Sequence, residues 1–390
     1  MKLFKSLLVA PATLGLLAPM SVSANELNLA EVSGYSSSEE VQNISEFYPK
    51  ELAVTNSRLD GLEVRINEIE AGSFSETTTA SFSTDFYFGG VDGGTDATAD
   101  PFMLTYGFQI DLNTSFTGED SLDISLDAGN TTAATTGVTQ FDGNATADSV
   151  DVDGVSYTFP LGGATAFVAD NGDASALFTT ACTYGGPTNT LDDCGNVNAG
   201  PSSGGTAAGV SYDFGNGWAA ALWYQNANAE EDQGILTDES TDTYALNGSY
   251  TGSNYGVSVT YASQEDGVLA TSKEDTYTAF NAYFTPDSEN LPSVSVGYEM
   301  GDDASKTTLD EVTSFFVGLQ WDEVGPGSLG VAAGHSSTVE GVEEAYMYEA
   351  YYSYPVNDGM TITPVVYTKE NVTAGVDDTT GFMVKTSFSF

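Results

Sequence analysis

The last eleven residues decide the fold that we expect for this chain, and they read Thr380-Gly381-Phe382-Met383-Val384-Lys385-Thr386-Ser387-Phe388-Ser389-Phe390. Side chains alternate between the two faces of an extended strand. Phe382, Val384, Thr386, Phe388 and Phe390 share one face, and Met383, Lys385, Ser387 and Ser389 share the other. The chain is therefore predicted to end in an amphipathic strand that finishes on an aromatic residue.

The beginning of the chain has the composition of an export signal. Lys2 and Lys5 form a basic start, residues 7–20 form an apolar run, and Val22-Ser23-Ala24 offers a small-residue cleavage site. We predict a signal peptide over residues 1–24, cleaved after Ala24. Its apolar run is too short for a transmembrane helix, and no later run is long enough. Any membrane span of the exported chain must therefore be made of strands.

The charge of the chain is strongly acidic. It has 56 Asp and Glu against 9 Lys and Arg, which gives a net charge of −47. A polyanionic partner would be repelled, so nucleic acid is excluded. The same charge raises the local concentration of cations.

From residue 73 to residue 390 the chain alternates with period two. Tyr255, Val257, Val259 and Tyr261 alternate with Gly256, Ser258 and Thr260, for example, and many runs are roughly ten residues long. We count about sixteen such strands, joined alternately by tight links (such as 159–162, 214–217 and 251–254) and long acidic ones (such as 128–148, 170–205 and 227–241). This arrangement predicts an all-β transmembrane antiparallel barrel of about sixteen strands, closed by pairing of 380–390 with 73–88.

A short helix is predicted before the barrel, after a polar linker over residues 25–49. Residues 50–71 have a heptad pattern that is typical of a parallel coiled coil, with Arg and Glu beside the apolar seam. We expect this stem to form a homotrimer; an amphipathic helix packed on its own domain is the alternative. The predicted stem residues are Leu52, Arg58, Leu59, Leu62, Glu63, Arg65, Ile66, Ile69 and Glu70.

Cys182 and Cys194 are the two cysteines of the chain. In an exported protein such a pair favours a disulfide. Four turn-forming residues lie between them, Gly185, Gly186, Pro187 and Asn189. We therefore predict that the two cysteines are bonded within the long connection 170–205.

Several stretches together resemble a known family. They are the signal, the helix that begins near Glu51, the run 70–79 (EAGSFSETTT) and the stretch 181–195 around the two cysteines. The chain is similar to cyanobacterial outer-membrane porins of the carbohydrate-selective family. The terminal Phe390 on an amphipathic strand also resembles the signal that the barrel assembly machinery reads. Residues 44–49 resemble the start of the family's wall-binding domain, whose remainder is missing, so contact with peptidoglycan stays open.

The alternation also predicts which charged side chains line a pore. The acidic residues expected to face the lumen are Asp85, Asp111, Asp123, Asp127, Asp213, Glu299 and Glu349, and the basic one is Lys385. Carboxylates along a water-filled passage favour cations. In trimeric porins a long connection at the place of 170–205 folds inward, so we expect it to narrow the channel, with the disulfide reducing its freedom.

The prediction is thus a passive channel for small hydrophilic solutes such as ions, with sugars left open, in contact with outer-membrane lipid. We expect no cofactor, no metal and no enzymatic activity. One alternative is a soluble acidic Ca²⁺-binding surface protein or adhesin, with oxygen ligands near Asp92–Asp100 or Asp148–Gly154. A barrel enzyme that uses the single histidine, His335, is another.

Overall fold

Antiparallel strands make up most of the residues that the structure describes. In this part of the chain they are β1 (Thr78–Asp92), β2 (Met103–Thr114), β3 (Ser121–Gly129), β4 (Asp151–Leu161), β5 (Ala164–Asp170), β6 (Thr206–Gly215), β7 (Trp218–Asn226), β8 (Asp242–Thr251), β9 (Tyr255–Glu265), β10 (Glu274–Phe284), β11 (Ser293–Asp302), β12 (Glu311–Val324), β13 (Gly327–Val339), β14 (Met347–Asn357), β15 (Met360–Lys369) and β16 (Thr379–Ser389). This confirms the predicted all-β class and strand number.

A computed structural model provides these coordinates. It describes residues 77–94, 102–131, 140–141, 143–172, 176–200, 204–227, 229, 234–237, 240–265, 274–288, 290–303 and 310–390. The predicted signal peptide, linker and coiled-coil stem lie outside them. Within these ranges, no helix is long and apolar enough to cross a membrane.

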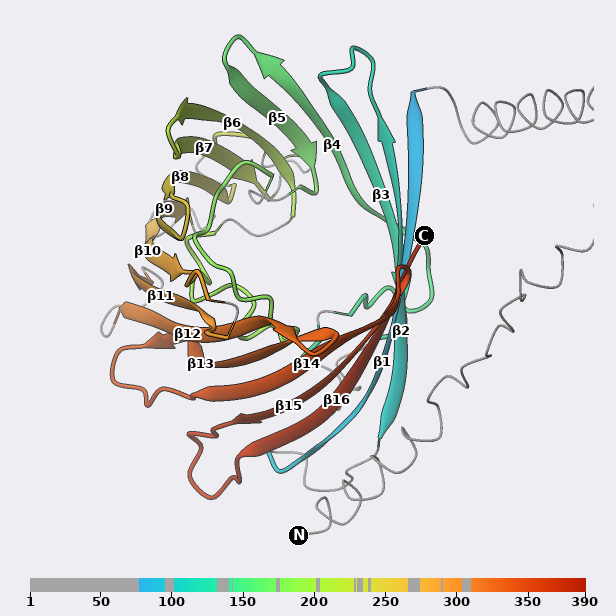
Figure 1. Ribbon diagram of the computed structural model, residues 1–390. Coiled ribbons are helices and arrows are strands. Elements are labelled where there is room, and N and C mark those ends of the chain that lie inside the picture. The colour runs from blue at the N-terminus through green and yellow to red at the C-terminus, as the bar shows by residue number, and fades with distance from the viewer. Residues whose placement is uncertain are drawn as a thin grey trace, which may run out of the picture. The chain divides into compact units, whose positions relative to one another are not determined.

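The strands close into a ring in which each strand pairs with its sequence neighbours, and β16 pairs with β1 (Figure 1). The closing register runs from Ser83 opposite Ser389 to Asp92 opposite Thr380. The sequence correctly predicted that the two ends meet, but it placed the partner of β16 at 73–88. The first residues of β1 pair with β2 alone, because strands in a closed barrel are staggered against one another.

Connections of unequal length alternate around the ring. The turn between β6 and β7 consists of Asn216 and Gly217, which both have a positive φ, 55° and 86°. Asn-Gly accepts this backbone conformation at little cost, and the resulting turn matches the twist of a hairpin. The opposite ends of the strands carry the long connections, among them residues 171–205 between β5 and β6.

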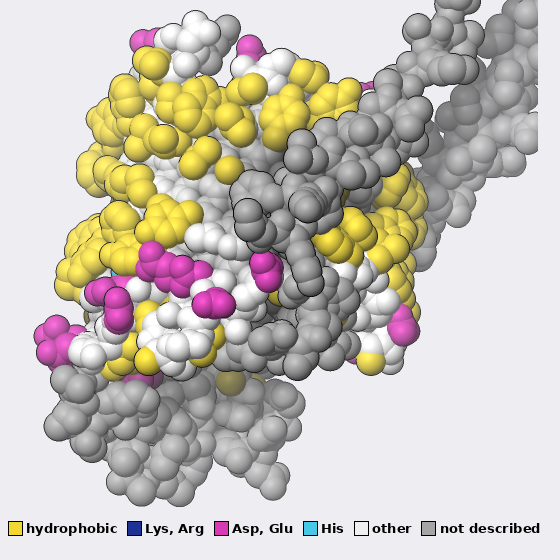
Figure 2. Space-filling view, turned by 90° about the horizontal axis from the view of Figure 1, so that it is seen from below, with side chains coloured by type: hydrophobic (Ala, Val, Ile, Leu, Met, Phe, Trp, Pro, Cys, Tyr) yellow, Lys and Arg dark blue, Asp and Glu magenta, His cyan; other side chains and the backbone are white. Residues whose placement is uncertain are grey.

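The two faces of the barrel wall differ in polarity. On β9, Val257, Val259 and Tyr261 point outward and are 44%, 45% and 42% exposed, whereas Ser258 and Thr260 between them are 3% and 0% exposed. We call these two surfaces the outer wall and the inner wall. Figure 2 shows hydrophobic side chains over much of the outer wall, with acidic groups gathered toward one end. This is the reverse of a water-soluble sheet protein and the pattern of a transmembrane barrel.

Part of the barrel interior is packed. One cluster joins inner-wall side chains of β12–β16 to the connection 171–205, and it includes Phe316, Met347, Tyr351, Val365 and Met383. A second cluster does the same on β5–β10 and includes Trp223, Ala245 and Ala279. The connection therefore belongs to a core inside the barrel, and it lies against one side of the interior (Figure 1).

Candidate functional site

The connection between β5 and β6, residues 171–205, runs across the inner wall; we call it the inward loop. Its backbone N–H groups meet wall side chains at every second residue, as expected for an extended segment. The four hydrogen bonds, each donated by the loop, are Thr179 N to Asn247 Oδ1 at 3.1 Å, Ala181 N to Ser258 Oγ at 2.9 Å, Thr183 N to Ser295 Oγ at 2.9 Å, and Gly185 N to Gln320 Oε1 at 2.8 Å. Polar side chains on β8, β9, β11 and β12 thus accept the hydrogen bonds of the loop backbone.

The predicted disulfide is present in this loop. Cys182 and Cys194 are bonded, with their Cα atoms 6.4 Å apart. Asn281 on β10 donates a hydrogen bond from Nδ2 to the carbonyl oxygen of Cys194 at 2.8 Å. A Cβ atom at Gly297 on β11 would overlap that same oxygen, so a glycine is needed for the close approach.

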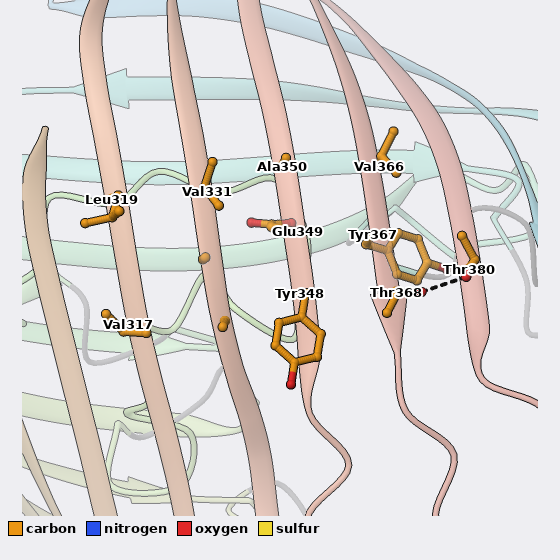
Figure 3. Close-up of a pocket in the computed structure, with 12 residues that line it drawn as sticks. Val317, Leu319, Val331, Tyr348, Glu349, Ala350, Val366, Tyr367, Thr368 and Thr380 are labelled. Carbon is orange, nitrogen blue, oxygen red and sulfur yellow. Dashed lines mark hydrogen bonds between the residues drawn. The ribbon is translucent and has the colours of Figure 1, made fainter. Parts of the chain in front are cut away.

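Two predicted pore-lining acids, Glu299 and Glu349, do point inward, but the inward loop covers them. They are 1% and 3% exposed. Glu349 accepts hydrogen bonds from Tyr184 Oη at 2.6 Å and Thr188 Oγ1 at 2.5 Å. In Figure 3, Glu349 sits on β14 between Tyr348 and Ala350, which belong to an apolar groove of about 510 Å³ on the outer wall. Both acids anchor the loop instead of facing open water.

The inner wall of β1–β3 carries four further predicted acids, Asp85, Asp111, Asp123 and Asp127. Asp111 accepts hydrogen bonds from Gln109 Nε2 at 2.9 Å and Ser125 Oγ at 2.7 Å. Asp123 accepts from Asn113 Nδ2 at 2.5 Å and Ser121 Oγ at 2.7 Å. These donors are neutral, so they orient the carboxylates without cancelling their charge. We call the inner face of β1–β4 the acidic wall.

Solved structures that are similar to this chain have the same architecture. Pseudomonas putida OprB at high pH matches with a TM-score of 0.60 over 85% of this chain and 97% of that chain, at 12% identity. A variant of the Rh. blastica porin matches with a TM-score of 0.52 over 80% of this chain and 100% of that chain, also at 12% identity. The chain has the fold of a bacterial porin.

Comparison of sequences gives a distant relative. An uncharacterized protein of Nostoc sp., alr4550, is 25% identical over 415 residues, which span 90% of this chain and 72% of that protein. No family model matches the chain. The assignment of the porin fold therefore rests on the solved structures. The Nostoc protein is uncharacterized and gives no information about activity.

The acidic wall of this porin fold contains two residues that sequence reasoning assigned elsewhere. Asp151 and Asp153 were read as part of a connection that could bind Ca²⁺, but they belong to β4. Asp151 lies opposite Asp127, and Gln109 Nε2 lies 3.4 Å from Asp153 Oδ2. An irregularity in the pairing of β3 with β4 shifts the alternation here, so a strict period of two could not find Asp153.

Asp213, the remaining predicted acid, lies at the turn end of β6. It is exposed and accepts a hydrogen bond from Gly215 N at 2.7 Å, so it stabilises the turn at the rim. Among the described residues, no group of three or more His, Cys, Asp or Glu side chains is placed to hold a metal ion.

The basic side chains of the described residues also lie on the inner wall. Lys385 on β16 forms an ion pair with Asp85 at 3.0 Å. Lys369 on β15 has its Nζ 3.5 Å from Thr190 Oγ1 of the inward loop. The alternation predicted Lys385, but not Lys369, as a pore-lining residue.

His335 sits on β13, 5% exposed. Its ring lies 5.1 Å from that of Tyr346, and its Nδ1 is 3.2 Å from Thr338 Oγ1 and 3.0 Å from the carbonyl oxygen of Ser336. These contacts give the histidine a packing role at the end of the β13–β14 hairpin.

Proposed function

We propose that this protein is an outer-membrane porin, a passive water-filled channel that admits small hydrophilic solutes and favours cations. The observation that carries the proposal is the polarity of the barrel wall, apolar outside and polar inside, around an interior that one loop narrows. In a soluble surface protein, the apolar side chains of β9 would be exposed to water, which argues against an adhesin. The porin fold itself is non-enzymatic.

The acidic wall supports the cation preference. Carboxylates on neighbouring strands add their potentials in a narrow, poorly screened passage. Lys385 compensates Asp85 on this wall, whereas Asp111 and Asp123 accept hydrogen bonds from neutral side chains. The net field along this wall should therefore attract cations and repel anions.

The inward loop supports a size limit on the solute. It is tied to the wall by hydrogen bonds on several strands and closed on itself by the Cys182–Cys194 disulfide. A loop held in this way keeps the passage at one width, so small ions should pass faster than sugars.

Three further parts of the proposal come from the sequence. Residues 1–24 direct export, residues 50–71 form the trimeric stem, and Phe390 serves as the recognition point for barrel assembly. Phe390 is 79% exposed on the barrel, which is compatible with such a role.

Planar-bilayer recording of the purified protein tests the proposal. In a KCl gradient, discrete current steps and a reversal potential of cationic sign are expected. Absence of steps would contradict the channel, and an anionic sign would contradict the role of the acidic wall. Swelling of protein-containing liposomes in sugars of increasing size measures the limit that the loop imposes.

A further inference from the structure

Two buried carboxylates of the barrel wall accept hydrogen bonds from two parts of the inward loop, which we call its first arm (residues 184–188) and its second arm (residues 198–199). Glu349 on β14 accepts from the first arm, through the hydroxyl groups of Tyr184 and Thr188. Glu299 on β11 takes the second arm: its Oε2 accepts from Asn198 N at 2.8 Å and Ala199 N at 2.7 Å, and its Oε1 accepts from Asn198 Nδ2 at 2.6 Å. Tyr184 and Thr188 lie inside the segment 182–194 that the disulfide closes, and Asn198 and Ala199 follow that segment in the sequence.

The remaining loop-to-wall contacts are of a weaker kind. The N–H groups of Ala181 and Thr183 meet neutral serine hydroxyls. Hydrogen bonds to an ionised acceptor are roughly twice as strong as neutral ones. Glu349 and Glu299 provide the attachments of this stronger kind, Glu349 to residues inside the segment that the disulfide closes and Glu299 to residues after it.

The chemistry of the two attachments differs. A hydroxyl group can either donate or accept, so the partners of Glu349 can also bond to an amide. The backbone N–H groups of Asn198 and Ala199 can only donate, and both donate to Oε2, so they need one oxygen acceptor at position 299. A glutamine at position 299 can supply that oxygen while its NH₂ group donates to the side-chain amide of Asn198, turned over to accept. A glutamine at position 349 can likewise bond to Tyr184 and Thr188, whereas an apolar side chain at either position leaves the loop donors without an acceptor.

We propose that Glu299 and Glu349 are positioning residues that fix the inward loop and with it the width of the passage. Each position can be replaced by glutamine but not by an apolar side chain. The effect on channel width rests on the proposed porin function. The attachment of the loop does not.

The first test is single-channel recording of Glu299→Leu and Glu349→Leu beside Glu299→Gln, Glu349→Gln and the wild type. The two glutamine variants should keep the single conductance level of the wild type. The two leucine variants should lose it and show several levels with increased open-channel noise. A uniform wild-type level in either leucine variant, or the same loss in its glutamine counterpart, would overturn the proposal.

Asp111→Asn provides the matched control. Asp111 is also an inner-wall carboxylate, but its donors, Gln109 and Ser125, belong to the wall and not to the loop. This variant should shift the reversal potential and keep one conductance level. If it became as noisy as Glu299→Leu, loss of lumen charge rather than release of the loop would explain the noise, which also overturns the proposal.

The second test measures reduction of the disulfide and does not depend on channel activity. Cys194 is 2% exposed beneath the loop, so release of either arm should expose the disulfide. The rate at which dithiothreitol reduces it in the folded barrel should rise in Glu299→Leu and Glu349→Leu, and stay at the wild-type rate in Glu299→Gln and Glu349→Gln. Equal rates in all five proteins would contradict the anchoring role.

Asn198→Ala changes the same attachment from the loop side and leaves the wall intact, which keeps the test valid should Glu299→Leu fail to fold. It removes one of the three hydrogen bonds to Glu299 and should raise the reduction rate, though less than Glu299→Leu. If the wild type forms no channels, the proposed function is wrong. The reduction rates still show whether Glu299 and Glu349 hold the loop.

Discussion

The carboxylate of Asp85 lies 3.0 Å from the ammonium group of Lys385, across the seam where the first strand meets the last. The Lys385 ammonium also lies 5.7 Å from the centre of the Tyr87 ring, and Tyr87 Oη donates to Asp85 Oδ2 at 3.3 Å. The pair thus places a compensated charge on the acidic wall, within the proposed passage.

Removing either partner should change ion selectivity in opposite directions. Lys385→Gln leaves Asp85 uncompensated and should move the reversal potential in a KCl gradient further toward the cation value. Asp85→Asn leaves the ammonium group of Lys385 uncompensated and should move the reversal potential away from the cation value. The side chains are 32% and 25% exposed, so either change should alter stability by about 1 kcal/mol or less. Shifts of the same sign in both variants would contradict this account.

Asp120, in the turn before β3, should make barrel stability depend on pH. The hydroxyl of Tyr157 and the backbone N–H of Thr117 hold the pKa of Asp120 well below its usual range. Because the folded pKa is the lower one, the stabilisation is present above the unfolded value of about 4 and is lost as the pH falls further.

Asp120→Asn tests this dependence. Melting temperatures of wild type and variant in detergent should differ most at pH 7 and converge below about pH 4. Glu119→Gln, in the same turn and exposed, is the control and should follow the wild type. A gap that stays constant down to pH 2 would show that Asp120 does not act through its charge.

The terminal residue should have separate roles in stability and in assembly. Phe390 and Phe82 exchange two backbone hydrogen bonds of 3.0 Å, and their rings stack at 5.7 Å. Deletion of Phe390 should cost the purified barrel roughly 2–3 kcal/mol, since both bonds and the ring pair are lost.

Phe390→Ala keeps the backbone bonds and should cost only about 1 kcal/mol, the contribution of the ring pair. If the assembly machinery reads the ring, this variant should nevertheless be depleted from the outer membrane in cells, measured by immunoblot of membrane fractions. Normal yield in cells would contradict the recognition role.

The predicted stem can be tested by breaking its seam. Leu59→Asn together with Ile66→Asn places two amides at core positions of about three heptads, which should abolish the trimer. Light scattering in detergent measures the mass. Asn67→Ala, off the seam, should remain trimeric. A trimer that survives the double change would show that the barrel assembles without the stem.

The strands and their two faces could be predicted from sequence because each depends on neighbouring residues alone. Ser293, Ser295, Gly297 and Glu299 had to share a face once β11 was extended, and the structure places them on the inner wall. The same argument fails at Asp153, where the pairing irregularity between β3 and β4 changes the direction of the side chain.

The sequence predicted alternating strands, a closed barrel and a disulfide within one long connection, and the structure confirms these three features. Only the tertiary structure decided which inward carboxylates meet water and which meet protein. Glu299 and Asp111 obey the same alternation, yet Glu299 lies beneath residues 198–199, about a hundred positions earlier in the chain. Period two fixes the side of the wall to which a side chain points, whereas its burial depends on a loop that reaches it across the barrel interior.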